Sequence, residues 1–333
     1  MRLTRTSAVA IAAGVAGVAL SACSAGGRST GSAARTAGAV PAAATSPTTG
    51  YSYTTPSSAR PAATTLPAPT TPPTTAVPAG WRVVSTTAQG AAVEERNVTV
   101  PGGDQVVLLR FLSGRTSFAL HVGSSDPPVG NAVIPASAGS VITAAERPYL
   151  LAAFNGGFKT STYSGGVEVD GVVLKPLVTG EASLVIDTNG AARVAVWGSG
   201  APLAGESVAS VRQNLPPLVT AGQASSAINV ISAWGATIRG YTHVARSALC
   251  SDSAGNLVYA GSGSAVPADL STALIDAGCV TAMEMDINPY WVMADVAATP
   301  GGPLSATVPG QNQSATQYLN GWSRDFVTVL AAP

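Results

Sequence analysis

Short apolar and alternating segments dominate the chain from residue 81 onward. Gln105–Leu112 and Thr116–Val122 alternate or run apolar, which is typical of half-buried and buried strands. Val167–Val173 predicts a β-hairpin, because Asp170-Gly171 suits the two positive-φ positions of a type I′ turn. Two further strand pairs are predicted at Ser183–Asp187 with Arg193–Trp197 and at Ala248–Ser251 with Leu257–Ala260.

One predicted helix interrupts this series of strands. Pro267–Ala277 places its leucines on one face, and Gly278 follows where a helix would end. The nearly apolar strand Cys279–Ile287 comes next. This strand–helix–strand order predicts an α+β fold, with a mixed β-sheet, many short strands and hairpins, and a few covering helices. Residues 81–333 are long enough for one domain with a sizeable core.

The first 22 residues have the pattern of a secretion signal. Arg2 and Arg5 precede the apolar run Ala8–Leu20, which is too short for a stable membrane-spanning helix. The run ends in Leu20-Ser21-Ala22-Cys23, which resembles the bacterial lipobox. That resemblance implies cleavage before Cys23, a lipid on its sulfur and anchoring at the extracytoplasmic face of the cell membrane. The alternative is an ordinary signal peptide with a cysteine there by chance.

Residues 23–80 have the composition of a disordered tether. From Ser24 to Gly80, 49 of 57 residues are Ala, Ser, Thr, Pro or Gly, so the few apolar residues cannot form a core. Pro and Thr dominate Pro56–Pro78, where we expect an extended and fairly stiff chain. We therefore expect a signal peptide at 1–22, an Ala/Thr/Pro-rich tether at 23–80 and one domain at 81–333.

The 17 basic and 17 acidic residues are unevenly divided along the chain. Residues 1–80 contain five arginines and no acid, which leaves 12 basic and 17 acidic residues in 81–333. A domain without a basic excess argues against nucleic-acid binding. It also means that a phosphate-bearing substrate has to be captured by local groups rather than by the overall field.

Cysteine parity predicts one disulfide. If Cys23 carries lipid, Cys250 and Cys279 remain in an oxidising compartment. One ends a predicted strand and the other begins the strand after the helix, so we expect them to pair. The alternative is two separately buried thiols.

Several common catalytic motifs are missing from the sequence. It contains no G-x-S-x-G elbow, no Walker loop and no G-x-G-x-x-G after a strand. The two histidines, His121 and His243, are too far apart in sequence to suggest a zinc motif, and no metal ligands are assigned. A carboxylate-based Ca²⁺ or Mg²⁺ site stays open as an alternative.

An apolar strand runs directly into Asn155-Gly156-Gly157-Phe158. Paired glycines let successive backbone N–H groups face one anion, which makes Asn155, Gly156 and Gly157 candidate substrate-binding residues. The alternative is an ordinary turn between two strands.

Acidic, amide and aromatic residues gather at the end of the strand that follows the helix. In an extended strand, Glu284, Asp286 and Asn288 point to one face. Neighbouring carboxylates repel, which can raise the pKa of one and separate acid from base roles. Tyr290 and Trp291 lie beside them in the sequence. The alternative is a solvated face of an edge strand.

Two basic residues are candidates for phosphate binding. Arg246 precedes an apolar strand, and its guanidinium group suits bidentate contact with a phosphate. Lys159 follows the Asn-Gly-Gly-Phe segment and is the weaker candidate. The alternative for Arg246 is a surface ion pair.

The ordered series of these segments resembles the phosphodiester glycosidase family, whose type activity removes N-acetylglucosamine from a phosphodiester. The resemblance covers most of residues 95–295. Asp286 keeps the acid of the family's final Asp-Gly-Gly-Gly-Ser motif, whereas Ile287-Asn288-Pro289-Tyr290-Trp291 replaces the glycines. The matching segments are Asn155-Gly156-Gly157-Phe158, Gly165 to Gly171, Ser183 to Trp197, Arg212 to Val219, Arg246-Ser247-Ala248 and Leu270 to Asp286.

The resemblance implies an extracytoplasmic hydrolase that cleaves a sugar phosphodiester, such as an N-acetylglucosamine-1-phosphodiester in a cell-wall or capsule polymer. Asp286 and Glu284 would share the acid and base roles. The other groups would bind substrate: Arg246 and Lys159 the phosphate, Asn155, Gly156 and Gly157 the sugar phosphate, Asn288 a polar group, and Tyr290 and Trp291 a sugar face. The alternative is a non-catalytic lipoprotein that binds cell-wall glycan in the same cleft.

Overall fold

The computed structural model describes residues 79–162, 165–237 and 240–333. The predicted signal peptide, the predicted lipidation site Cys23 and nearly all of the predicted tether lie outside these ranges. Within them, no helix has the length and apolar character needed to cross a membrane.

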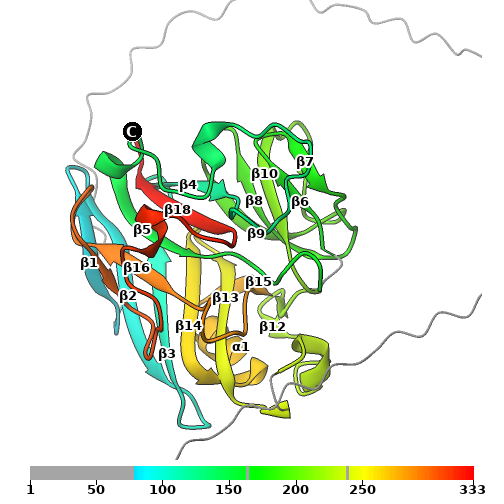
Figure 1. The fold of residues 1–333 in the computed structure, drawn as a ribbon. Coiled ribbons are helices and arrows are strands. Elements are labelled where there is room, and N and C mark those ends of the chain that lie inside the picture. The colour runs from blue at the N-terminus through cyan, green and yellow to red at the C-terminus, as the bar shows by residue number, and fades with distance from the viewer. Residues whose placement is uncertain (1–78, 163–164, 238–239) are drawn as a thin grey trace, which may run out of the picture. The chain divides into compact units, whose positions relative to one another are not determined.

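Eight strands form the largest sheet, in the order β1-β2-β3-β14-β13-β15-β11-β12 (Figure 1). Its central strands β14, β13 and β15 are buried along most of their length, as expected for strands that are covered on both faces. The strands are β1 (Arg82–Thr87), β2 (Gly90–Thr99), β3 (Gln105–Phe111), β11 (Val219–Thr220), β12 (Gln223–Ala224), β13 (Val244–Asp252), β14 (Leu257–Ala265) and β15 (Cys279–Glu284).

Two five-stranded sheets complete the fold. Their strand orders are β7-β6-β10-β8-β9 and β17-β16-β5-β18-β4. The second of these carries the last strand of the chain, β18, between β5 and β4. The strands are β4 (Thr116–His121), β5 (Leu150–Asn155), β6 (Val167–Val169), β7 (Val172–Lys175), β8 (Ala182–Asp187), β9 (Ala192–Val196), β10 (Val208–Gln213), β16 (Ala294–Ala297), β17 (Leu304–Ala306) and β18 (Phe326–Ala331).

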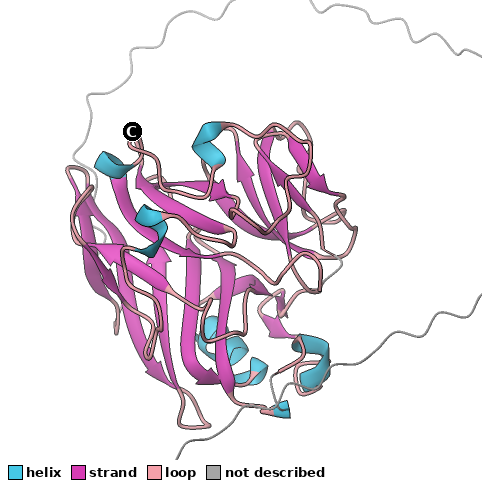
Figure 2. Cartoon of the chain, in the orientation of Figure 1, coloured by secondary structure: helices cyan, strands magenta, loops and turns pink. Residues whose placement is uncertain are grey.

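The prediction of an α+β fold is wrong, because the described domain is predominantly β and helices form no layer of it (Figure 2). The sheets cover one another instead: the largest apolar cluster joins Leu109 of β3, Phe154 of β5 and Leu184 of β8. The paired strands of the described residues are antiparallel, rather than mixed. The helical segments are α1 (Pro267–Asp276), α2 (Gln317–Asn320) and the 3₁₀ turns η1 (Ala136–Ala138), η2 (Arg147–Tyr149) and η3 (Ile231–Trp234).

The predicted helix is α1, and it packs on one region of the largest sheet. Leu270 and Leu274 of α1 join a separate apolar cluster with Leu108 of β3 and Val258 of β14. One ten-residue helix covers only part of an eight-stranded sheet, so the remaining apolar strand faces are buried by the other sheets.

The predicted hairpins and the predicted disulfide are confirmed. Asp170 and Gly171 join β6 to β7 with φ values of 47° and 77°, the positive values that the Asp-Gly pair predicted. The pairs β8–β9 and β13–β14 are also hairpins. Cys250 of β13 and Cys279 of β15 form the disulfide, with 5.8 Å between their Cα atoms.

Candidate functional site

The candidate site lies where the largest sheet meets the sheet that contains β5 and β18. Ser247 of β13 connects the two, because its Oγ accepts hydrogen bonds from Asn155 Nδ2 at 2.9 Å and from the backbone N–H of Asp286 at 3.1 Å. Ser247 also exchanges backbone hydrogen bonds with the chain just after β15. Asn155 and Asp286, which are 131 positions apart in sequence, are thereby held against one buried hydroxyl.

Asn155 is buried, and its side chain is fully used in holding this junction. Its Nδ2 donates to Ser247 Oγ and to the carbonyl of Gly156, and its Oδ1 accepts from Tyr259 Oη at 2.9 Å and from the backbone N–H of Met293 at 3.2 Å. Four bonds satisfy its hydrogen-bonding capacity. The structure therefore places Asn155 beneath the cleft, where it positions neighbouring residues.

Gly156 and Gly157 wrap around a carboxylate of the protein itself. The backbone N–H of Gly156 donates to the carbonyl of Asp325 at 2.9 Å, and that of Gly157 lies 3.4 Å from Asp325 Oδ2. A Cβ on Gly156 would lie 2.1 Å from Asp325 Oδ2, so only glycine fits there. Arg212 holds the same carboxylate through Nε at 2.6 Å. The anion that this Asn-Gly-Gly segment faces is Asp325.

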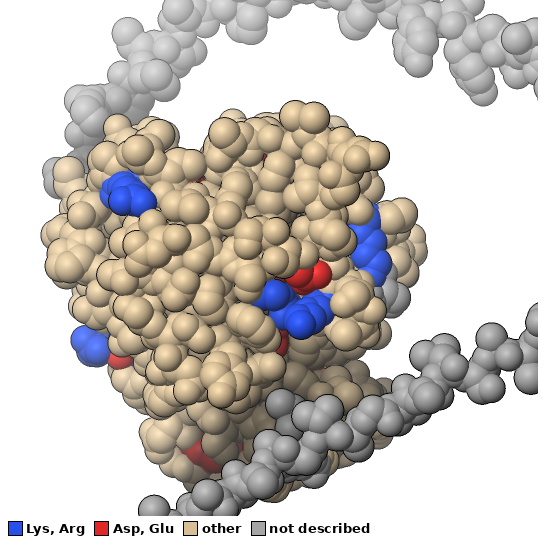
Figure 3. Space-filling model, viewed as in Figure 1, with Lys and Arg blue, Asp and Glu red and all other residues tan. Residues whose placement is uncertain are grey.

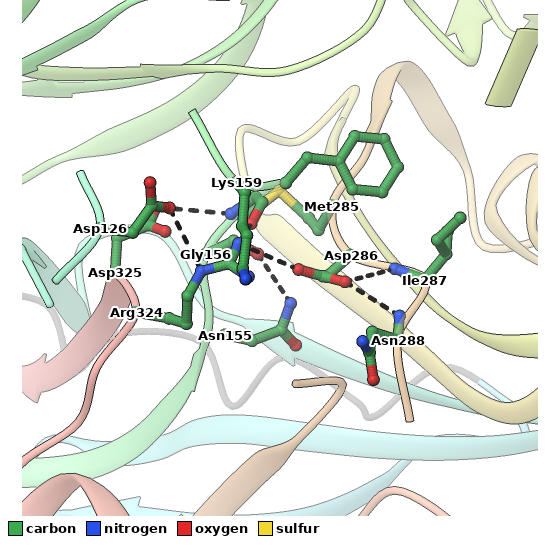
Figure 4. A network of polar contacts seen from close by, with 12 residues as sticks. Asp126, Asn155, Gly156, Lys159, Met285, Asp286, Ile287, Asn288, Arg324 and Asp325 are labelled. Carbon is green, nitrogen blue, oxygen red and sulfur yellow. Dashed lines mark hydrogen bonds and ion pairs between the residues drawn. The ribbon is translucent and has the colours of Figure 1, made fainter. Parts of the chain in front are cut away.

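Asp286 lies just beyond the end of β15 and is the acid at the cleft (Figure 4). Its Oδ1 accepts hydrogen bonds from the backbone N–H groups of Ile287 at 2.7 Å and Asn288 at 2.9 Å. Burial raises the pKa of the Asp286 carboxyl to about 6, while Arg324 and the two backbone donors oppose the rise. A carboxyl with this pKa can exchange a proton with substrate near neutral pH.

Arg324 is the main residue of the site that the sequence did not single out. Its Nη2 donates to Asp286 Oδ2 at 3.3 Å and to the carbonyl of Gly157 at 2.7 Å, and its Nε lies 3.2 Å from Asp126 Oδ2. The guanidinium carbon is 5.2 Å from the ring centroid of Trp291. The sequence feature that could have identified Arg324 is the charged pair Arg324-Asp325, which directly precedes the apolar strand β18.

Glu284 and Arg246 form a buried ion pair and do not line the cleft. Arg246 Nη1 donates to Glu284 Oε1 at 2.6 Å, and both side chains are fully buried. Arg246 also donates to the carbonyls of Ala265 and Trp234. Burial raises the pKa of Glu284, and the adjacent guanidinium opposes the rise. Arg246 therefore binds Glu284 and backbone carbonyls behind the cleft, and its guanidinium group does not face the cleft.

The cleft itself has a volume of about 370 Å³. Lys159 and Arg324 are the cations that line it, and Asp286 is the carboxylate. Figure 3 shows basic and acidic side chains side by side on a face that is otherwise mostly uncharged. The lining residues are Phe158, Lys159, Thr162, Leu215, Gly235, Ala236, Asp286, Ile287, Asn288, Trp291 and Arg324.

The remaining predicted site residues divide between the cleft and its surroundings. Lys159, Asn288 and Trp291 line it, so the structure brings them together with Asp286. Asn288 also accepts the backbone N–H of Tyr290 at 3.0 Å, which turns the chain out of β15. Tyr290 is 59% exposed and is not among the lining residues.

The cleft offers poor ligands for the Ca²⁺ or Mg²⁺ site that the sequence allows. Asp286 is the single acid among the lining residues, and one of its oxygens faces Arg324. Calcium takes six to eight oxygen ligands and magnesium an octahedron of oxygens. The donor set at the cleft therefore fits an organic anion beside Arg324 and Lys159 better than a hard cation.

Comparison with solved structures finds distant similarity to proteins that include a glycosidase. The catalytic domain of zebrafish N-acetylglucosamine-1-phosphodiester alpha-N-acetylglucosaminidase, auto-inhibited by its pro-peptide, has 17% identity and a TM-score of 0.48, over 76% of this chain and 88% of that one.

Two bacterial structures are more distant. A hypothetical protein from Synechocystis has 13% identity and a TM-score of 0.42, over 73% of this chain and 63% of that one. A putative exported protein from Burkholderia pseudomallei has 11% identity and a TM-score of 0.37, over 70% of this chain and 76% of that one. No family model and no curated protein matches the chain.

Proposed function

We propose that the protein is a hydrolase that cleaves a sugar phosphodiester in this cleft, with Asp286 as the general base. The observation that carries the proposal is the placement of Asp286: a buried carboxyl with a pKa raised to about 6, beside Arg324, at the wall of a cleft with two cations. Carboxyl groups that lie in clefts and have shifted pKa values commonly act as acid–base catalysts.

The reaction requires one base and a means of stabilising negative charge. Asp286 takes a proton from a water molecule, whose oxygen attacks the anomeric carbon of the sugar. The bond between that carbon and the phosphate oxygen breaks, and its electron pair leaves with the phosphate. The products are a sugar with a free anomeric hydroxyl and a phosphomonoester, and Asp286 then returns its proton to solvent.

A phosphate leaving group explains why one carboxylate at the cleft is sufficient. Most glycosidases use a second carboxyl to protonate a poor leaving group. A phosphomonoester is already a stable anion near neutral pH, so cations can replace the acid. Arg324 and Lys159 are placed for this role. Glu284 contributes indirectly, since it is fully buried and paired with Arg246.

The size and lining of the cleft suit a sugar phosphate. A volume of about 370 Å³ falls within the range of small-molecule sites. The aromatic side chains of Phe158 and Trp291 lie in the same lining as the two cations, so a sugar face and a phosphate can be held together. Asn288 would supply a polar contact to the substrate.

The proposed location is the extracytoplasmic face of the cell membrane, with the domain anchored through a lipid on Cys23. The lipobox-like Leu20-Ser21-Ala22-Cys23 and the Ala/Thr/Pro-rich residues 23–80 support it. A palmitate analogue should label the full chain in cells, and Cys23→Ala should abolish the label. Persistent labelling of Cys23→Ala would contradict the proposed anchor.

The activity is tested with the full chain on N-acetylglucosamine-1-phosphodiesters and on phosphate-containing wall polymers. We expect release of free sugar by the wild type and loss of turnover in Asp286→Asn, with substrate binding retained. Asp276→Asn, an exposed acid at the end of α1, is the matched control and should keep full turnover.

The second candidate function is binding of cell-wall glycan without cleavage. It is favoured by the exposed aromatic Tyr290 next to the cleft and by replacement of the glycines after Asp286. Measurable glycan binding with no turnover by the wild type, on any of these substrates, would establish this alternative and refute the hydrolase.

A further inference from the structure

Three metal-ligating side chains converge at a place separate from the cleft. Asp104, His243 and Asp269 each present one ligand atom, and these atoms all lie within 4.8 Å of one another. None of the three lines the cleft. We propose that they bind a Zn²⁺ ion.

The three ligands come from three different segments of the chain. Asp104 directly precedes β3, His243 directly precedes β13, and Asp269 lies in the first turn of α1. Gly102, in the turn before Asp104, passes so close that a Cβ there would lie 3.5 Å from both carboxylate oxygens of Asp269. An ion at this point would connect the β2–β3 turn, the start of β13 and the helix.

The local hydrogen bonds leave ligand atoms available. Asp104 Oδ2 is buried and has no hydrogen-bond partner within the described residues, which is costly for a carboxylate oxygen without a cation. His243 Nε2 lies 3.7 Å from this atom, and its Nδ1 lies 3.2 Å from Thr242 Oγ1. A hydroxyl on the second ring nitrogen is the kind of contact that orients a metal-bound histidine.

Asp269 uses one carboxylate oxygen to accept a hydrogen bond at the start of α1, and its other oxygen can coordinate the ion. Its Oδ2 accepts the backbone N–H of Val266 at 3.2 Å, as an acidic residue in the first helical turn commonly does. Its carboxylate has a second oxygen that can coordinate a cation on the other side. The side chain is almost wholly buried, so its position is set by the packing of α1.

The spacing requires only a small closure around the ion. Zinc binds imidazole nitrogen and carboxylate oxygen at about 2.0–2.2 Å, which puts neighbouring ligand atoms in a tetrahedron roughly 3.4 Å apart. The separation between His243 and Asp104 is already 3.7 Å. His243 is half exposed, at 51% of its side-chain surface, and can approach the two acids without repacking the core. Water would complete the tetrahedron.

The donor set selects zinc rather than calcium. Imidazole suits zinc and related transition metals, whereas calcium needs six to eight oxygen ligands. The zinc site does not depend on the proposed hydrolase activity.

Titration calorimetry with ZnCl₂ on the full chain tests the proposal. The starting protein carries Cys23→Ser, which removes the one cysteine outside the disulfide. We expect one Zn²⁺ per chain, and binding about 10-fold weaker or more in His243→Asn and in Asp104→Asn. Asp276→Asn, an exposed acid at the other end of α1, is the control and should bind zinc unchanged.

Two further measurements keep the outcome decisive. Co²⁺ should give visible absorption bands of a tetrahedral site that disappear in His243→Asn, and circular dichroism should show that this variant remains folded, since His243 is at the surface. No zinc binding by the parent protein overturns the proposal. So does equal zinc binding by parent and His243→Asn, or calcium binding that exceeds zinc binding.

Discussion

Arg324 Nη2 donates to Asp286 Oδ2 at 3.3 Å and joins the segment before the last strand to the acid of the candidate site. The same guanidinium group donates to the carbonyl of Gly157, so it also fixes the turn that follows β5. Arg324 therefore has two effects: it orders the wall of the cleft and holds down the pKa of a buried carboxyl.

Arg324→Gln should move the acid limb of the pH–rate profile upward. A base must be ionised to act, so kcat/KM should rise as pH increases through about 6, the pKa of Asp286. Loss of the cation should raise this pKa by about one unit or more. The pH dependence of kcat/KM for a sugar phosphodiester measures the shift, and Arg324→Lys should move the limb less. An unchanged limb in Arg324→Gln would contradict the coupling.

Glu284→Gln should strongly destabilise the domain. Arg246 would be left fully buried without a counter-charge, and breaking a buried pair from one side costs about 3–5 kcal/mol. Arg82→Ala is the comparison and should cost less than about 1 kcal/mol, because the Arg82 side chain is 66% exposed and Glu95 keeps its hydrogen bond from Asn97 Nδ2. Urea unfolding of each variant gives the difference. An equal loss of unfolding free energy in the two variants would show that the buried ion pair contributes no more to stability than the exposed one.

Gly156→Ala should also be destabilising, because of Asp325 rather than backbone conformation. The added Cβ would meet the Asp325 carboxylate and its carbonyl, at 2.1 Å and 2.8 Å, and forced overpacking in a core costs about 1–3 kcal/mol. Gly200→Ala, where the nearest atom is 3.6 Å away, should be close to neutral. Thermal melting of both variants checks this, and a neutral Gly156→Ala would contradict the packing argument.

Asp295 should make the domain less stable as pH rises. Burial raises the pKa of the Asp295 carboxyl to about 7, while Gln311 donates to its Oδ1 at 2.8 Å. Between the unfolded pKa near 4 and about 7, the folded state binds more protons, so its stability falls by up to about 1.4 kcal/mol per pH unit. Asp295→Asn should flatten this decline. Unfolding free energies of both proteins between pH 4 and 8 provide the test, and parallel curves would refute it.

Local sequence signals predicted much of the secondary structure. The Asp170-Gly171 hairpin, the helix from Pro267 and the Cys250–Cys279 disulfide depend on neighbouring residues or on parity, and all three are present. The fold class could not be reached in the same way. Whether a strand face is covered by a helix or by another sheet is decided by packing between segments that are distant in sequence.

The same distinction separates the predicted and the missed parts of the site. Asp286 could be identified because it follows an apolar strand and matches the acid of the Asp-Gly-Gly-Gly-Ser motif. Arg324 could not, since it meets Asp286 and Gly157 only through the pairing of β18 with β5, where Phe326 lies opposite Asn155. The pairing of Arg246 with Glu284 likewise depends on the register of β13 and β15.

The position of β18 after all the other described strands sets when the candidate site can form. Arg324 and Asp325 follow Gly156 by nearly 170 residues, and β18 must insert between β4 and β5 before they reach Asp286 and the two glycines. During synthesis, β4 and β5 therefore emerge long before the strand that separates them. A nascent chain that has not yet reached β18 would contain most of the cleft lining but no assembled site, so the site forms only after β18 has been synthesised.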